Sequence, residues 1–246
     1  MNNQLLLNDI LAHLADIFAT DRFPISERGG LYNPSGRPVQ RIGLALEPWP
    51  DIANWVRSER LDALWLHRPW KLNLALFPAD VGILMHHLPF DEHLTTGYNK
   101  LLANVLAMES LEELGYKQAV DELVGTLPKR PIGMIGNVPE RTYEEWLDQI
   151  GKEFVGYDRA ERGQAHTHER IAVVGAMNPA LIHEAHERNV TLYLTGEYRK
   201  GTQKAVDETG MGVIAIGHRR TEEWGLRALG TLLREQWRGL DVLVKE

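Results

Sequence analysis

The stretch Gly82-Ile83-Leu84-Met85-His86-His87-Leu88-Pro89-Phe90-Asp91-Glu92-His93 decides how the rest of the chain is interpreted. Its apolar first half is typical of a buried strand, and its second half is polar and contains Pro89. Open α/β sheets place their sites beyond the carboxyl ends of such strands, so we expect Asp91 in a crevice, as a metal ligand or a base. An ordinary strand-to-helix turn, with Asp91 and Thr95 as helix caps, explains the same residues.

The composition limits the ligands that a metal site in this chain can use. The 246 residues carry a formal net charge of −7, 43% of them are hydrophobic, and none is a cysteine. Disulfides, thiolate metal sites and a cysteine nucleophile are therefore excluded. A divalent metal ion would be held by His, Asp or Glu, a set of donors that suits zinc, manganese, iron, cobalt or nickel.

The apolar segments and the charge also indicate where the protein acts. No run approaches the length of about eighteen apolar residues that a transmembrane helix needs. The first residues lack the basic start and long apolar region of a secretory signal, so we expect a cytoplasmic protein with no membrane partner. The acidic balance argues against nucleic acid as a partner.

Strands and helices are predicted to alternate along the chain. Strands at 39–46 and 61–66 flank a helix at 51–59, and this βαβ unit predicts a parallel sheet. We expect further strands after residue 127, alternating with helices. Two other expectations are helices at 98–106 and 109–114, and a polar loop around His166 and His168.

The fold class predicted is α/β, with two α/β domains of related topology and mixed sheets flanked by helices. Residues 1–125 and 205–246 are expected to form a metal-binding domain. Residues 126–204 are expected to form a second α/β domain inserted in the first. The division follows from the candidate ligands, which come from both ends of the chain, whereas the middle supplies strands and helices of its own.

Four candidate metal ligands lie at comparable places in this pattern. His67, Asp91 and His218 each follow a predicted strand. Glu222 comes four residues after His218, so the two side chains share a face if a helix begins there. Two imidazoles and two carboxylates make a plausible site for a first-row metal, and carboxylates can bridge two metals in hydrolases. Each residue could instead be an ordinary polar loop residue.

Five segments, in order along the chain, resemble motifs of the NIF-three-like family of dinuclear-metal proteins. Members of that family are often named GTP cyclohydrolase I type 2 homologues. The segments are His67-Arg68-Pro69-Trp70, 87–103, 132–139, Thr195-Gly196-Glu197 and 217–222. They extend over more than half of the chain.

The resemblance implies a two-domain α/β protein that forms a ring-shaped hexamer and binds a pair of divalent metals. By residue, it implies ligands at His67, Asp91, His218 and Glu222, with His87 and Glu197 as catalytic or supporting groups. His87 could also be a packing histidine, and Glu197 could simply pair with Arg199. This chain departs from the family in carrying Arg68 where the second of two adjacent histidines is usual.

Arg68 cannot ligate a metal and stays charged, so we expect it to oppose a second cation. One or two metals per chain are therefore expected. The guanidinium could also clamp a phosphate and so take part in catalysis.

The function predicted is metal-dependent hydrolysis of a small phosphorylated or nucleotide-like substrate, by a protein whose partner is itself. One alternative is a non-catalytic regulatory or scaffold ring with a structural metal, and another is a ring associated with nucleic acid. Catalysis predicts an open coordination position, whereas a structural metal predicts a closed shell. Nucleic-acid binding predicts a steep dependence on salt.

Overall fold

The computed structural model describes residues 4–246 and divides them into two compact units. Unit 1 comprises the chain up to Phe90, Val120–Leu127 and Leu226–Glu246, and unit 2 comprises Asp91–Ala119 and Pro128–Gly225. These bounds differ from the division predicted above, 1–125 with 205–246 and 126–204. The division predicted from the sequence stays a prediction about which segments fold together.

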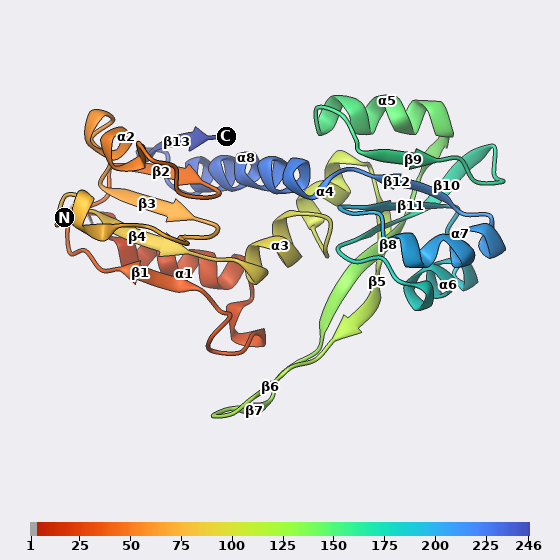
Figure 1. The fold of residues 1–246 in the computed structure, drawn as a ribbon, viewed down its shortest axis with the longest axis horizontal. Helices are drawn as coiled ribbons and strands as arrows, with labels where there is room; N and C mark the ends of the chain where they lie inside the picture. Colours follow the sequence, from red (N-terminus) through yellow and green to blue (C-terminus); the bar gives the residue numbers. More distant parts are fainter. Residues whose placement is uncertain (1–3) are drawn as a thin grey trace. The chain divides into compact units, whose positions relative to one another are not determined.

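Unit 1 is built on a five-stranded sheet with the order β1-β4-β3-β2-β13 (Figure 1). Its strands are β1 (Gly30–Asn33), β2 (Arg41–Ala45), β3 (Ala63–Leu66), β4 (Gly82–Met85) and β13 (Asp241–Lys245). All neighbours run parallel except β1, which is antiparallel to β4. The parallel pairing of β2 and β3 through a helix confirms the predicted βαβ unit, whereas β1 and β13 were not predicted.

The helices of unit 1 pack closely on this sheet. They are α1 (Leu7–Ile17), α2 (Ile52–Ser58) and the later part of α8 (His218–Gln236), with short 3-10 helices η1 (Thr20–Arg22) and η2 (Leu74–Leu76). A Cβ on Gly43 in β2 would lie 2.5 Å from the Trp55 ring of α2, so glycine permits this contact. The strand-and-helix cluster around Leu64 and Ile83 is fully buried, as a sheet covered on both faces requires.

Unit 2 is built on a six-stranded mixed sheet with the order β5-β8-β10-β11-β12-β9. Its strands are β5 (Glu109–Lys117), β8 (Arg130–Thr142), β9 (Arg159–Glu161), β10 (Thr167–Val174), β11 (Leu192–Thr195) and β12 (Gly212–Ala215). The neighbours β10, β11 and β12 are parallel, and the remaining pairs are antiparallel.

Helices flank both faces of the sheet of unit 2. Helix α5 (Tyr143–Glu153) lies on one face, and α6 (Pro179–Glu187) and α7 (Gln203–Thr209) lie on the other, with η3 (Lys200–Thr202) leading into α7 (Figure 1). Helices α3 (Leu88–Leu94) and α4 (Lys100–Val105) precede the sheet in the chain. A mixed sheet with helices on its faces confirms the predicted α/β fold class.

A short hairpin, β6 (Val120–Asp121) and β7 (Gly125–Thr126), joins β5 to β8 and belongs to unit 1. The Asp121 carboxylate accepts a hydrogen bond from the backbone N–H of Ile25 at 2.8 Å and caps its own turn through Leu123 and Val124. These backbone hydrogen bonds hold the pKa of Asp121 below its usual value.

The helix predicted at 109–114 is wrong, because these residues form strand β5. The preceding helix α4 ends at Val105, and Ala107 and Ser110 adopt positive φ angles of 56° and 52°, which interrupt any continuation. Glu112 and the rest of β5 then pair with β8, a long-range contact that overrides the local helical pattern.

The polar loop predicted around His166 and His168 is also wrong in part. Strand β10 already begins at Thr167, and the His168 side chain is fully buried. Its Nδ1 atom lies 2.9 Å from the Thr191 hydroxyl, and its ring packs on Tyr143. His168 faces inward from the start of β10, but the polar residues around it in the sequence made the segment look like a loop.

Candidate metal centre

The first turn of helix α8 brings two predicted ligands together. Strand β12 ends at Ala215, and Gly217, with a φ of 109°, turns the chain so that the helix begins at His218. A Cβ on Gly217 would lie 2.8 Å from the Asp158 carboxylate, which adds a second reason for glycine. His218 Nε2 lies 3.1 Å from Glu222 Oε1, as the four-residue spacing predicts.

Asp91 completes a group of three within unit 2. One ligand atom from each of Asp91, His218 and Glu222 lies within 4.8 Å of the others. Ligand bonds of about 2.1 Å place two donors on one ion about 3 Å apart when adjacent and about 4.2 Å apart when opposite. The His218–Glu222 separation of 3.1 Å therefore suits adjacent positions on one ion.

The two ends of this group differ in exposure. The Glu222 side chain is only 3% exposed, whereas that of His218 is 56% exposed. A buried carboxylate gains from a cation beside it, and an exposed imidazole leaves the group open to solvent. The donor chemistry and the spacing together fit a divalent metal ion.

Helix α3, which carries Asp91, is tied to the segment that follows it by side-chain hydrogen bonds. The Thr95 hydroxyl donates to the Asp91 carbonyl at 2.6 Å, and the Asn99 amide donates to the Thr95 carbonyl at 3.0 Å. Asn99 also caps α4 by accepting from two backbone N–H groups. Asn99 caps α4, and Asp91 lies within α3, so Asp91 is not the helix cap that the alternative interpretation proposed.

A buried ion pair fixes the residue next to Asp91. Arg130 of β8 donates from Nε to Glu92 Oε2 at 2.8 Å, and the two side chains are 6% and 11% exposed. Lys117 of β5 adds a weaker contact to the same carboxylate at 3.5 Å. The pair thus ties α3 to the sheet of unit 2, and it was missed because its partners are distant in the sequence.

A second group of possible ligands comprises His67, His87 and Asp91, again with atoms within 4.8 Å of one another. His67 follows β3, its backbone N–H donates to the Ala45 carbonyl at 3.2 Å, and its side chain is fully buried. The His67 and His87 rings meet edge to face at 5.0 Å. Asp91 is common to both groups.

Arg68 contacts one of these possible ligands. Its Nε donates to His87 Nε2 at 3.1 Å, its Nη1 donates to Glu47 Oε1 at 3.3 Å, and its guanidinium lies over the Trp70 ring. Glu47 was not singled out from the sequence, although it follows β2 directly, at the same edge of the sheet as His67. The structure thus places the Arg68 guanidinium beside His87. Its role in opposing a second cation stays a prediction.

His86 and His87 point to different surroundings, as adjacent residues at a strand end should. His86 is buried, and its Nδ1 accepts a hydrogen bond from the Trp65 indole at 3.1 Å. Burial lowers the pKa of His86 to about 3, so this imidazole is neutral. Only His87 belongs to a possible ligand group.

Glu197 belongs to neither of the two ligand groups found among residues 4–246. It follows β11, is 57% exposed, and pairs with Arg199 at 2.6 Å, which is the alternative considered from the sequence. Its catalytic role stays a prediction.

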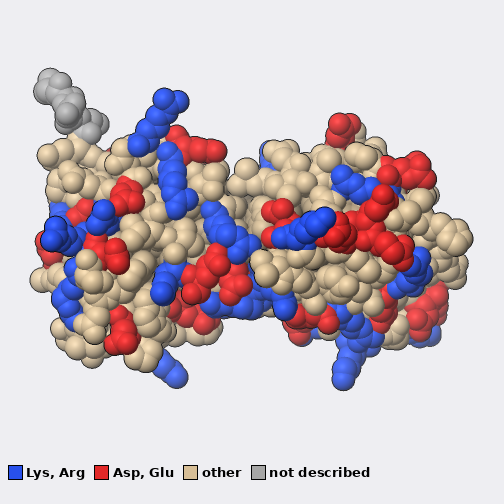
Figure 2. Space-filling view, turned by 90° about the horizontal axis from the view of Figure 1, so that it is seen from above, with Lys and Arg blue, Asp and Glu red and all other residues tan. Residues whose placement is uncertain are grey.

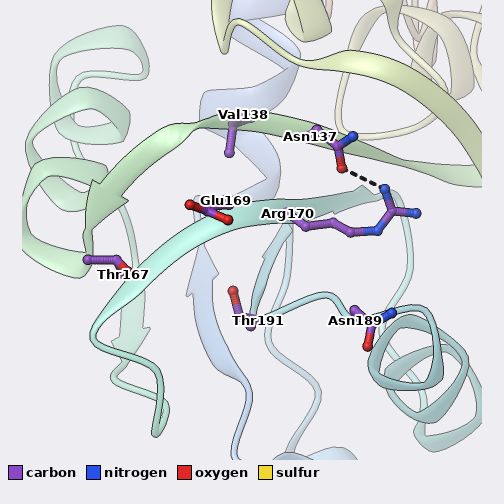
Figure 3. Close-up of a pocket in the computed structure, with 7 residues that line it drawn as sticks. All are labelled: Asn137, Val138, Thr167, Glu169, Arg170, Asn189 and Thr191. Carbon is purple, nitrogen blue, oxygen red and sulfur yellow. Dashed lines mark hydrogen bonds between the residues drawn. The ribbon is translucent and has the colours of Figure 1, made fainter.

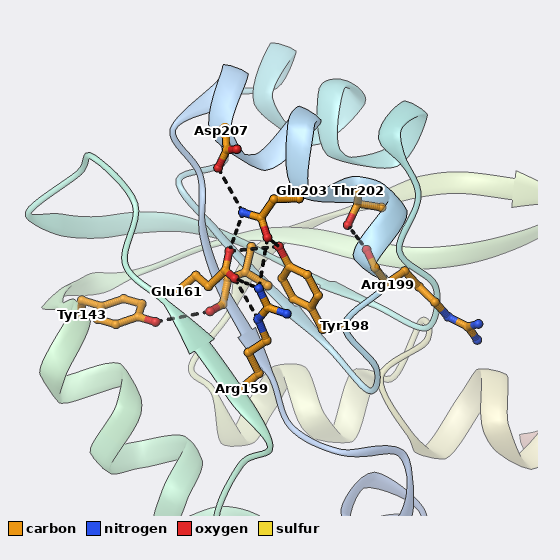
Figure 4. Close-up of polar contacts among 9 residues, drawn as sticks. Tyr143, Arg159, Glu161, Tyr198, Arg199, Thr202, Gln203 and Asp207 are labelled. Carbon is orange, nitrogen blue, oxygen red and sulfur yellow. Dashed lines mark hydrogen bonds and ion pairs between the residues drawn. The ribbon is translucent and has the colours of Figure 1, made fainter.

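The loop that carries Glu197 is fixed by polar contacts of its neighbour Tyr198 (Figure 4). The Tyr198 hydroxyl lies 2.9 Å from Glu161 and 2.7 Å from Gln203, and the Arg159 guanidinium stacks on its ring at 3.7 Å. Burial and the bond to Glu161 raise the pKa of Tyr198 to about 12, so the phenol stays protonated. The loop is therefore anchored beside Glu197.

A family model described as Duf34/NIF3 (NGG1p interacting factor 3) matches residues 68–246, which is well over half of the chain. The chain belongs to the Duf34/NIF3 family. This match confirms the resemblance read from the five motifs. Among residues 4–246, no helix is both long and apolar enough to span a membrane.

Curated relatives in the Duf34/NIF3 family extend over nearly the same length. The GTP cyclohydrolase 1 type 2 homolog of Pyrococcus abyssi is 27% identical over 244 residues, with 93% of each chain covered. The homolog of Allochromatium vinosum is 25% identical over 247 residues and covers 94% of this chain and 92% of its own.

Solved structures agree on the fold. The Bacillus cereus protein related to NIF3 has a TM-score of 0.71 at 12% identity, with 97% of this chain and 96% of its own covered. Reduced HcgD from Methanocaldococcus jannaschii has a TM-score of 0.70 at 17% identity, with 98% of each covered. At these identities the likeness shows the fold alone.

Proposed function

We propose that this Duf34/NIF3 protein is a metal-dependent hydrolase that acts on a small phosphorylated or nucleotide-like molecule. The observation that carries the proposal is the group Asp91, His218 and Glu222, with two carboxylates and one imidazole spaced for a single ion. The name of the relatives, GTP cyclohydrolase 1 type 2 homolog, supports a nucleotide-like substrate. A bound divalent ion supplies Lewis acidity, which polarises a phosphoryl oxygen and acidifies water.

The protein groups have separate tasks in this proposal. Asp91 and Glu222 would hold the ion with their carboxylates, and His218 Nε2 would be the donor next to Glu222 Oε1, 3.1 Å away. The open side at His218 leaves room for a substrate to reach the ion. His67 is proposed as a further ligand, as the sequence predicted.

Arg68 is proposed to bind the phosphate of the substrate through its positive charge. Its guanidinium is held by His87 and Glu47 and can exchange the Glu47 contact, at 3.3 Å, for a phosphate oxygen. Glu197 is exposed after β11 and is proposed as the base for an attacking water. Both assignments follow the candidate residues taken from the sequence.

We also propose that the protein acts as a homo-oligomer, a hexamer in keeping with the family resemblance, in the cytoplasm. Acidic and basic side chains are interspersed on the face of each unit that Figure 2 draws, and the net charge is −7. This distribution supports a small-molecule substrate over nucleic acid. Light scattering at micromolar concentration tests the assembly, and a monomer there would remove it.

Elemental analysis tests the metal, and a substrate panel tests the reaction. The protein is treated with a chelator, reconstituted with zinc, manganese or iron, and assayed for phosphate and base release from nucleotides including GTP. We expect at least one retained metal per chain and turnover that Asp91→Ala abolishes. Retained metal without turnover would favour the regulatory or scaffold alternative with a structural metal. The absence of retained metal after reconstitution would contradict the proposal.

A further inference from the structure

A hollow lies at the interrupted pairing of β8 and β10, and none of the residues assigned to the metal centre lines it. From His168 to Arg170 strand β10 advances two residues, whereas the partners on β8, Arg141 and Asn137, are four residues apart. Strand β8 therefore carries extra residues at 138–140, including Pro139, which cannot donate to the ladder. Bulges of this kind often form beside sites, because they open a sheet locally.

The hollow has a volume of about 580 Å³, in the range of small-molecule sites (Figure 3). It is lined by residues of β8, of β10 and of the segment that leads into β11. Their polar groups are two amides, two hydroxyls, a carboxylate and a guanidinium, from Asn137, Asn189, Thr167, Thr191, Glu169 and Arg170. The segment 132–139, one of the five sequence motifs, ends in this hollow and has no role in the proposed hydrolysis.

Arg170 organises the side of the hollow near β8. Its Nη1 donates to Asn137 Oδ1 at 2.7 Å, its Nε donates to the Arg188 carbonyl at 2.8 Å, and its Nη2 donates to Glu112 at 2.5 Å. Because Asn137 Oδ1 accepts from Arg170, the Asn137 amide N–H groups remain as donors. Each nitrogen of the guanidinium already donates within the protein, so Arg170 acts as a scaffold more than as an anion receptor.

Thr191 supplies a hydroxyl donor from the other side. Its Oγ1 lies 2.9 Å from Nδ1 of the buried His168, and Nε2 of that ring has no hydrogen-bond partner among the described residues. A buried N–H without an acceptor is rarer than a buried lone pair without a donor, so the proton belongs on Nδ1. His168 then donates to Thr191 Oγ1, which leaves the hydroxyl hydrogen of this lining residue available to a ligand in the hollow.

The lining selects the charge and polarity of a ligand. An anion would meet the Glu169 carboxylate, and a cation would meet Arg170, while Val138 is the one apolar side chain among the lining residues. A neutral molecule with several hydroxyl groups can donate to Glu169 and accept from the Asn137 amide and the Thr191 hydroxyl. Such alternating donors and acceptors are the chemistry of a sugar ring.

We propose that this hollow binds a furanose or pyranose ring, either as a free sugar or as the sugar of a nucleoside. The binding does not depend on the metal centre, because the lining residues are separate from all the assigned ligands. The sugar-binding proposal can therefore be correct or wrong independently of the proposed hydrolysis.

The test is saturation-transfer NMR on the chelator-treated full chain, with D-ribose, D-glucose and adenosine as separate probes. We expect transfer to the ring protons of at least one probe, and binding about tenfold weaker in Glu169→Gln, which loses a charged acceptor. Thr191→Val should weaken binding similarly. Transfer to adenosine alone identifies a nucleoside, and transfer to ribose or glucose identifies a free sugar.

Glu187→Gln is the matched control, because Glu187 is an exposed carboxylate of α6 outside the lining. It should bind the probe as the wild type does. Glu169 is itself exposed, so Glu169→Gln keeps the test decisive even if Thr191→Val unfolds. No transfer to any of the three probes, or equal binding by the wild type and Glu169→Gln, would overturn the proposal.

Discussion

Arg68 donates a hydrogen bond from Nε to His87 Nε2 over 3.1 Å, which puts a permanent cation against a possible metal ligand. A lone pair that accepts this hydrogen bond cannot coordinate an ion at the same time. The group of Asp91, His218 and Glu222 has two carboxylates and one imidazole, whereas that of His67, His87 and Asp91 has the reverse. The first of these is therefore the better cation site.

We expect the wild-type protein to retain about one metal per chain, and Arg68→His to raise this toward two. The substitution removes a positive charge, frees His87 Nε2 and adds an imidazole donor. Elemental analysis after dialysis against zinc or manganese measures the change. Two tightly held metals per wild-type chain would show that Arg68 does not exclude a second ion.

Asp91→Ala should abolish metal retention, because Asp91 is shared by both ligand groups. The fold should survive, since the Thr95 hydroxyl bonds the backbone carbonyl of Asp91 and not its side chain. Elemental analysis and circular dichroism are the measurements. Asp148→Ala, at a 63% exposed carboxylate on α5, is the control and should retain metal. Equal retention by the two variants would contradict the assignment.

Arg130→Met should destabilise the protein by about 3–5 kcal/mol, because it leaves the Glu92 carboxylate buried without its main cation. The double variant Arg130→Met with Glu92→Met should regain much of this loss, since both charges are then removed. Urea unfolding measures both values. Both variants should bind metal more weakly than the wild type, because α3 loses its tie to β8. Unchanged metal affinity would show that Asp91 is positioned without the ion pair.

Burial lowers the pKa of His168 from the usual 6.5, so the folded chain takes up a proton at this residue only at a lower pH than the unfolded chain does. As the pH falls from 6.5 toward the folded pKa, the unfolded chain binds more protons here than the folded chain, and stability falls. The slope from this residue is at most about 1.4 kcal/mol per pH unit.

Urea unfolding between pH 7 and pH 5 should show a shallower slope for His168→Gln than for the wild type. His166→Gln, at an exposed histidine two residues away, is the control and should keep the wild-type slope. Identical slopes in all three proteins would mean that His168 takes up its proton without unfolding.

Local features of the site were predictable from the sequence, and long-range ones were not. The spacing of His218 and Glu222 depends only on where one helix begins, and the strand-end position of His67 depends only on one apolar run. The capping box of Thr142 and Glu145 likewise depends only on residues three positions apart, and it is present.

The failures share a dependence on distant partners. Strand β5 looks helical until β8 pairs with it, and His168 looks exposed until Tyr143 and Thr191 cover it. The Glu92–Arg130 pair joins residues 38 positions apart, so periodicity could not reveal it. Local sequence patterns and composition do not reveal contacts between residues that are distant in the sequence.

The connection between the two compact units affects how the protein is made. The chain passes from one unit to the other after Phe90, Ala119, Leu127 and Gly225. Strand β13 pairs with β2 in unit 1, yet it is translated after every residue of unit 2. On the ribosome, β2 therefore keeps an unpaired edge while some 200 further residues are added. The nascent chain depends on protection of that edge. No single cut of the gene separates the two units, because unit 1 includes residues from both ends of the chain.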